Sequence, residues 1–169
     1  MNKKLFSLSL VTLSIMASSV YADLQIAMNL LNADGSETAI GTITASRNKC
    51  GVILTPNLHD LTPGVHGFHL HQKPSCADQG MAAGAHYDPQ KSNKHDGPYA
   101  AKGHLGDLPV LIVNKDGTAT TPVLAPRLSL QKLKGHALMI HVGGDNYADQ
   151  PEKLGGGGAR MACGVIAAN

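Results

Sequence analysis

The sequence has no tryptophan, and aromatic residues make up only 4% of its 169 positions. A folded core must therefore be built mainly from Val, Ile, Leu and Ala. Charged residues are also sparse at 15%, and no basic stripe indicates a nucleic-acid partner. After residue 22, no apolar stretch approaches the ~20 residues that a membrane-spanning helix needs. We therefore expect one domain with neither a nucleic-acid nor a membrane partner.

Only the start of the chain carries a long apolar run. A lysine pair precedes an apolar stretch over 5–16, and small residues then lead to Ala22. This pattern predicts a secretory signal peptide at 1–22, because the run is too short for a membrane anchor. The exported domain would be 23–169, with 12 basic and 12 acidic residues. Without net charge, attraction of an anionic substrate would need a local field.

Cysteines are few, and their number is odd. The chain has Cys50, Cys76 and Cys163. In an exported protein, we expect two of the three to pair and one to remain free. Their spacing alone does not say which two form the bridge.

Short alternating segments separated by turn residues dominate the rest of the chain. Asn114-Lys115-Asp116-Gly117 is a strong hairpin signal, while Pro56 and Pro63-Gly64 interrupt the pattern. There is no convincing long helix, so around eight short strands predict an all-β sandwich or barrel. The expected strands cover 24–31, 38–45, 50–55, 65–71, 110–113, 118–123, 136–142 and 161–166, with 128–130 as a further short candidate.

Two long segments break this regular pattern. Residues 72–108 are rich in Gly, Pro, His and Lys, and residues 143–159 contain four consecutive glycines. Loops of this length in a compact domain are usually functional or disordered. The first segment holds a cysteine, three histidines and Asp107, which could fix it in place, so we interpret it as functional.

Histidines are the most informative residues of the chain. In Gly67-Phe68-His69-Leu70-His71, strand alternation puts His69 and His71 on one face and the apolar pair on the other. His141 lies in a segment of the same kind. Imidazoles carried on strands suit copper or zinc. His86, His95, His104 and Asp107 supply the donor types of a tetrahedral zinc site.

Taken in order, these segments resemble the copper/zinc superoxide dismutases, over nearly all of 23–169. The glycine run and the signal peptide are similar to the bacterial periplasmic branch. The resemblance implies an eight-stranded Greek-key, immunoglobulin-like β-sandwich or barrel with two long functional loops. The matching motifs are Gly67-Phe68-His69-Leu70-His71, Gly84-Ala85-His86-Tyr87-Asp88-Pro89, Lys94-His95-Asp96-Gly97-Pro98, Gly103-His104-Leu105-Gly106-Asp107-Leu108 and Arg160-Met161-Ala162-Cys163-Gly164-Val165.

The resemblance also implies the cofactors, one copper and one zinc per subunit, and their ligands. Copper would cycle between oxidation states while it converts superoxide to dioxygen and hydrogen peroxide, and the bridging imidazole would take up a proton in the cycle. Zinc would order the first loop. The implied copper ligands are His69, His71, His86 and His141, and the implied zinc ligands are His86, His95, His104 and Asp107.

Further roles follow from the same resemblance. Asp145 would link a ligand of each metal through hydrogen bonds. Cys76 and Cys163 would form the disulfide, leaving Cys50 as a buried or edge-strand thiol. Arg160 would attract and orient the anion. The family is an established example of the sandwich fold and of electrostatically steered, diffusion-limited catalysis, so those expectations come with the resemblance.

Other charged residues and histidines have ordinary explanations. We expect His66 to hydrogen-bond to backbone, and His59 and His136 to face solvent. Loop lysines at 91, 94, 102 and 153 could steer an anion, but lysines on loops are more often only solubilising. The second loop lacks the acidic–acidic–lysine cluster of the eukaryotic branch, which leaves its steering mechanism open.

Three other functions compete with catalysis of superoxide dismutation. A copper-delivery protein of the same fold would not need zinc ligands or Arg160. A zinc hydrolase would need a general base beside an open zinc site. An adhesion module would not need six convergent histidines. We expect a periplasmic homodimer, with a monomer as the alternative.

Overall fold

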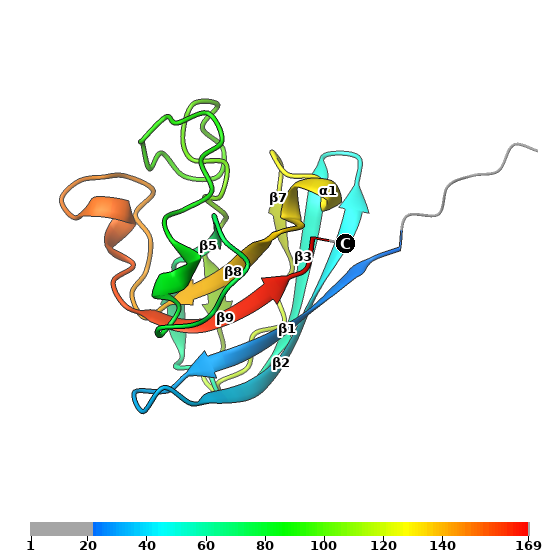
Figure 1. The fold of residues 1–169 in the computed structure, drawn as a ribbon, viewed down its shortest axis with the longest axis vertical. Coiled ribbons are helices and arrows are strands. Elements are labelled where there is room, and N and C mark those ends of the chain that lie inside the picture. Colours follow the sequence, from blue (N-terminus) through cyan, green and yellow to red (C-terminus); the bar gives the residue numbers. More distant parts are fainter. Residues whose placement is uncertain (1–21, 169) are drawn as a thin grey trace, which may run out of the picture.

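The computed structural model describes residues 22–168, so the predicted signal peptide lies outside the described residues except for Ala22. The regular secondary structure of the described chain is almost all β-strand, as its alternating pattern predicts. A seven-stranded antiparallel sheet in the order β5-β8-β9-β1-β2-β3-β7 curls into a half-barrel, and β4 and β6 form a separate pair (Figure 1). The strands are β1 (Leu24–Leu31), β2 (Glu37–Asn48), β3 (Gly51–Leu58), β4 (Gly64–His66), β5 (Phe68–His71), β6 (Leu111–Val113), β7 (Val123–Ala125), β8 (His136–His141) and β9 (Arg160–Ile166).

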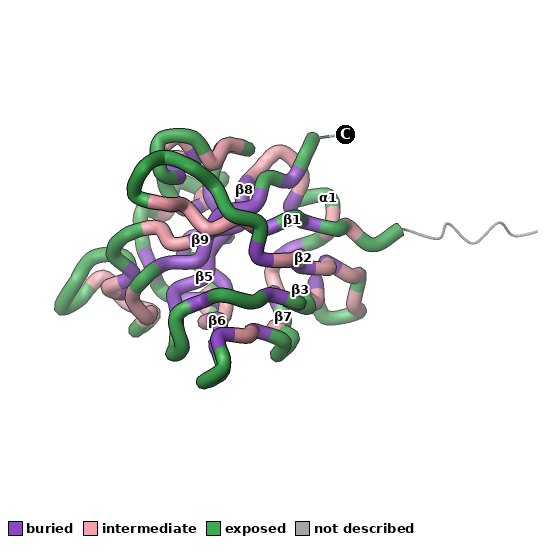
Figure 2. Tube along the Cα trace, turned by 90° about the horizontal axis from the view of Figure 1, so that it is seen from below, coloured by how far each residue is buried: buried purple, intermediate pink, exposed green. Residues whose placement is uncertain are grey.

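The concave side of the curled sheet is filled with aliphatic side chains. Along β1, Ile26 and Met28 are buried while the residues between them are not, which is the expected two-residue period. Val52, Leu54 and Leu58 fill the same interior from β3. Figure 2 shows the buried positions, in purple, gathered toward the middle of the molecule. The core therefore forms without tryptophan.

The strand expected at 65–71 is two strands. Gly64–His66 pairs with β6 in the small sheet, and Phe68–His71 pairs with β8 in the large one. Gly67 lies at the junction, where an added Cβ would be 3.1 Å from the carbonyl oxygen of Gly144. This break lets β5 leave one sheet and enter the other. Phe68 and Leu70 join the core, as predicted.

Three local predictions were wrong. The turn at 114–117 forms, with the Asn114 N–H donating to Thr118 O at 2.7 Å, but 118–123 is not the partner strand. Instead, β6 pairs with β4, and β7 pairs with β3. Pro56 does not end a strand, because β7 pairs only with 52–54 and leaves the edge beside Pro56 open. The candidate strand at 128–130 is instead the start of helix α1 (Leu130–Leu133), which is capped by the hydroxyl of Ser129.

The two long loops are held by specific contacts rather than by regular structure. They contain only the short 3₁₀ turns η1 (Met81–Ala83) and η2 (Lys153–Gly156). A disulfide joins Cys76 to Cys163 across 87 residues and fastens the first loop to β9. A bridge closing a loop of this length is worth about 4.6 kcal/mol in the chain-entropy model. The first loop is therefore fastened to β9, and the second loop connects β8 to β9.

Cys50 is the free thiol, and it is exposed in the turn between β2 and β3. The expected buried or edge-strand position was wrong, because the turn falls one residue later than the sequence indicated. None of the helices in the described part of the chain has the length and apolar character needed to cross a membrane.

Candidate metal centre

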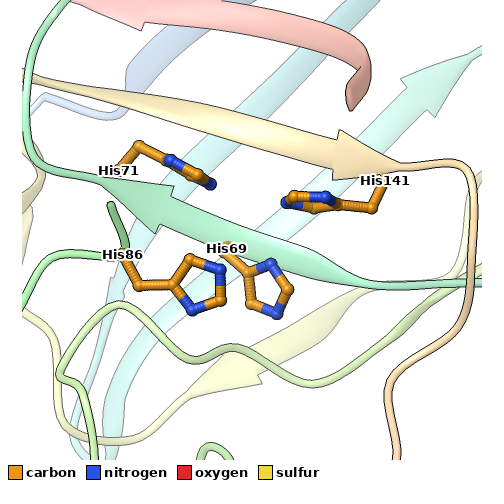
Figure 3. A group of neighbouring side chains, drawn as sticks. All are labelled: His69, His71, His86 and His141. Atoms are coloured by element: carbon orange, nitrogen blue, oxygen red, sulfur yellow. The ribbon is translucent and has the colours of Figure 1, made fainter. Parts of the chain in front are cut away.

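Four histidines from separate parts of the chain meet beneath the two loops (Figure 3). His69 and His71 lie on β5, His141 ends the neighbouring strand β8, and His86 comes from the first loop. One ring nitrogen from each lies within 4.8 Å of the others. All four residues are at most 7% exposed. The imidazoles on β5 point out of the core, as the alternation predicts, but the loops cover them.

Hydrogen bonds determine which nitrogen of each strand-borne histidine is available. A neutral imidazole carries one N–H, and in each case that N–H donates to the protein, so the other nitrogen keeps its lone pair. The free atoms are His69 Nδ1, His71 Nε2 and His141 Nε2, and each is buried without a hydrogen-bond partner. The donor pairs are His69 Nε2 to Asp145 Oδ2 at 2.8 Å, His71 Nδ1 to Gly84 O at 2.9 Å and His141 Nδ1 to Gly158 O at 3.2 Å.

These free nitrogens fit a metal ion better than any other occupant. A buried polar atom without a partner costs about 1–3 kcal/mol, so three together need a common explanation. A copper or zinc ion takes neutral imidazoles whose second nitrogen is fixed by a hydrogen bond. The first histidine group meets this description at each of its strand-borne members.

A second group converges on Asp107. Its Oδ1 lies 3.0 Å from Nδ1 of His86, 3.0 Å from Nδ1 of His95 and 3.3 Å from Nδ1 of His104. Asp107 Oδ2 and the Nδ1 atoms of His95 and His104 also lack hydrogen-bond partners. Three imidazoles and one carboxylate match the donor types of a closed tetrahedral zinc site.

His86 is the residue best placed to serve both groups. Its Nδ1 faces Asp107, so the opposite nitrogen, Nε2, is the one available to the first group. His69 also lies within 4.8 Å of members of both groups. However, His69 commits Nε2 to Asp145 and has one nitrogen left, so it can bind only one ion.

Asp145 connects the two groups through its carboxylate. His69 donates to Oδ2 and His95 donates to Oδ1, each at 2.8 Å. The backbone N–H of Tyr147 also donates to Oδ1, which fixes the carboxylate in the second loop. One carboxylate therefore orients one histidine of each group.

The charge balance of the second group is set by its carboxylates. Burial acts to lower the pKa of His95, but the close approach of Asp107 and the hydrogen bond to Asp145 outweigh it and raise the pKa to about 10. Burial acts to raise the pKa of Asp107, but the close approach of His104, His86 and His95 holds the pKa well below its usual range. Without a metal, a protonated His95 supplies the positive charge that two buried carboxylates require.

Arg160 lies beside the first group, as predicted. It is the register partner of His141 across β8 and β9. Its guanidinium donates to the carbonyls of Gly80 and Gly84, the second at 2.5 Å. Burial is the largest cause of the lowered pKa of His71, and the charge of His86 is the next that lowers it. The positive charge of Arg160 makes a smaller contribution in the same direction. The cation is therefore close enough to act electrostatically on the histidine group.

The remaining histidines lie outside both groups. His66 is buried, with its ring nitrogens 2.8 Å from the carbonyl oxygens of Thr62 and His141, so its predicted backbone role is confirmed. The prediction for His59 is also confirmed, because its side chain is 57% exposed. His136 is half-buried rather than solvent-facing, because its ring packs on Tyr87 with centroids 4.0 Å apart.

Sequence reasoning missed Asp149. Its Oδ2 accepts the backbone N–H of His95 at 3.0 Å, and its Oδ1 accepts that of Leu154 at 3.3 Å. The two loops meet through this carboxylate, although Asp149 and His95 are 54 positions apart. No local pattern in the sequence marks such a contact, because it depends on how the loops pack.

The chain matches the family model described as copper/zinc superoxide dismutase over residues 39–166. It is 55% identical over 170 residues to Cu-Zn superoxide dismutase 1 of Salmonella typhimurium, covering 94% of this chain and 96% of that protein.

Solved structures give the same family. The Cu/Zn superoxide dismutase from Brucella abortus superposes with a TM-score of 0.81 at 45% identity, covering 86% of this chain and 99% of the other. The solution structure of the monomeric copper, zinc superoxide dismutase from Salmonella enterica gives 0.75 at 54% identity, with the same coverage.

Proposed function

Because the chain belongs to the copper/zinc superoxide dismutase family, we propose that its two histidine groups divide between the two metals of that family. The chain is a superoxide dismutase, an oxidoreductase that converts superoxide to dioxygen and hydrogen peroxide with copper and zinc as cofactors. The proposed copper ligands are His69, His71, His86 and His141, and the proposed zinc ligands are His86, His95, His104 and Asp107.

One observation carries this division. The buried atoms without hydrogen-bond partners fall into two sets, one at the strand-borne histidines and one around Asp107. His86 lies between them, with Nδ1 toward Asp107 and Nε2 toward the strands. Eight ligand positions are filled by seven residues if His86 contributes to both sets.

Arg160, His86 and Asp145 have separate roles in the reaction. Bound copper supplies a reversible one-electron change, whereas zinc has no redox chemistry and supplies fixed charge. Arg160 attracts the superoxide anion and orients it beside His141. When it is not bound to the metal, Nε2 of His86 would take up a proton from solvent and donate it toward the peroxide product. Asp145 keeps His69 and His95 in the tautomers that leave Nδ1 free.

The decisive experiment follows superoxide decay directly. Purified protein is compared with and without copper, with zinc present in both samples. We expect fast decay only in the copper-loaded sample. Metal binding without copper-dependent decay would instead favour a copper-delivery protein of the same fold.

We also propose that the protein is exported to the periplasm after removal of 1–22. The intramolecular disulfide between Cys76 and Cys163 supports an oxidising compartment. Fractionation of cells and N-terminal sequencing of the mature protein test this. A mature N-terminus at Asp23 in the periplasmic fraction is expected.

The oligomeric state is a separate proposal. We propose a homodimer that buries the apolar face of the small sheet, where Val65 and Ile112 pair and are 54% and 49% exposed. The alternative is a monomer, the state named for the Salmonella enterica relative. Sedimentation of the wild type beside a Val65→Asp variant distinguishes the two states.

A further inference from the structure

Arg127 lies in the segment between β7 and α1 and has no role in either proposed ligand set. Its guanidinium donates hydrogen bonds to four backbone carbonyls of the first loop. The contacts are Nε to Pro98 O at 3.1 Å, Nη1 to Gly103 O at 3.0 Å, Nη2 to Gly97 O at 3.4 Å, and Nη2 to His104 O. All three guanidinium nitrogens are therefore engaged by one loop.

These carbonyls belong to the two ends of one stretch. Gly97 and Pro98 lie two and three residues after the proposed zinc ligand His95, and Gly103 directly precedes the proposed ligand His104. No regular secondary structure spans 97–104. The separation of the two ligands is therefore not fixed by a helix or a strand, and Arg127 is a fixed point that contacts both ends.

The four carbonyls need these donors because their residues are buried. A buried acceptor that loses its partner costs about 1–3 kcal/mol. Lysine cannot replace the contact, because its three N–H donors radiate from one atom, whereas arginine presents five in a planar fork. The shape of the guanidinium, and not only its charge, matches the loop.

Arg127 is also coupled to the zinc ligands electrostatically. Burial lowers the pKa of Arg127, and the negative charge of Asp107 opposes that effect. From the second loop, Asp149 accepts the backbone N–H of His95. The ligand-bearing loop is therefore held by hydrogen bonds to both Arg127 and Asp149.

We infer that Arg127 is a positioning residue of the zinc site, whose guanidinium sets the separation of His95 and His104 and thereby the affinity for zinc. This inference rests on the zinc ligands proposed above. It predicts that loss of Arg127 destabilises the zinc-bound protein more than the metal-free protein. Both lose the hydrogen bonds to the loop, but the ligand spacing matters only when one ion must contact both histidines.

The test compares Arg127→Gln and Arg127→Lys with the wild type. The matched control is Lys132→Gln, which removes one charge from an exposed residue lining the same surface cavity of about 440 Å³. Zinc affinity is measured by competition with a chromophoric chelator, and the geometry of the site by the visible absorption of cobalt(II) bound in place of zinc. Copper affinity is measured in parallel.

We expect both Arg127 variants to lose about 10–100-fold in zinc affinity, the usual cost of removing a group that orients metal ligands. The cobalt absorption should change in both, while copper affinity should remain at the wild-type value. Lys132→Gln should match the wild type in all three measurements. Restoration of zinc affinity by Arg127→Lys would overturn the role of the guanidinium shape.

A purely structural role is distinguished by unfolding. If Arg127 acts through the ligands, the gain in unfolding free energy on adding zinc should shrink in the variants. If both the metal-free and zinc-bound proteins lose equal stability, or zinc affinity is unchanged, the inference is wrong. Failure of the wild type itself to bind zinc or cobalt would instead overturn the proposed zinc site.

Discussion

Gly155 packs so closely against Asp145 that a Cβ at residue 155 would lie 2.7 Å from the carboxylate carbon of Asp145. The same Cβ would be 2.9 Å from Nε2 of His95. The glycine run therefore brings backbone next to the carboxylate that links the two metal groups. Gly155 is therefore needed because a side chain at this position would collide with Asp145, and not only because glycine is flexible.

Gly155→Ala should therefore displace Asp145, and Gly158→Ala should not. Both glycines have positive φ, 72° and 66°, so both alanines carry a backbone cost of about 1–2 kcal/mol. Of these two glycines, Gly158 is the one with open space around its Cβ position. We expect zinc affinity to fall about 10–100-fold in Gly155→Ala alone. Equal zinc affinity in the two variants would show that the close contact is unimportant.

Removing the shared ligand should affect both metals. We expect His86→Ala to lose zinc binding and most turnover and to bind copper more weakly, because His86 contributes to both sets. His104→Ala should weaken zinc binding only, and His141→Ala copper binding only. Metal content after dialysis against a chelator measures each effect. Full zinc retention by His86→Ala would contradict the bridging role.

Arg160→Ala should keep both metals but react more slowly with superoxide. Copper/zinc superoxide dismutases are an established example of electrostatic steering, so the expected loss, about tenfold or more at low salt, is taken from that class. Arg160→Lys keeps the charge and should retain more activity. Rates are measured across ionic strengths. A rate for Arg160→Ala equal to wild type at every salt concentration would disprove guidance by Arg160.

Metal-free protein should lose stability in mild acid. Burial is the main cause that lowers the pKa of His69 to about 3, of His71 to about 2 and of His141 to about 4. The unfolded chain binds protons near pH 6.5, which the folded chain excludes. The free energy of unfolding should therefore fall as pH drops from about 6.5 to about 4, by up to about 1.4 kcal/mol per pH unit for each histidine.

His95 does not contribute to that acid slope. Its raised pKa of about 10 gives stability that is complete below about pH 6.5 and lost as pH rises toward 10. Urea unfolding of the metal-free, disulfide-intact protein at several pH values measures both effects. His141→Gln should give a shallower acid slope than wild type. A free energy of unfolding that does not change below pH 6.5 would show that these histidines are not buried as neutral groups.

Local pattern predicted the strands better than their partners. β1 matches its expected bounds, because period-two alternation is a property of neighbouring residues. The turn at 114–117 was also correct, but the pairing of its flanks was not. Those flanks join β4 and β3, which are distant in sequence, and a turn signal carries no information about competing partners.

Local alternation and motif spacing already predict the all-β class, the residue types that can bind metal and their order along the chain. Which atoms meet depends on how the chain packs in three dimensions. The two sets of unpartnered buried atoms, the packing of Gly155 on Asp145, and the hydrogen bonds from Arg127 to the first loop join residues that are separated along the chain. Such contacts arise from packing and from the need to satisfy buried polar groups, which no short stretch of sequence encodes.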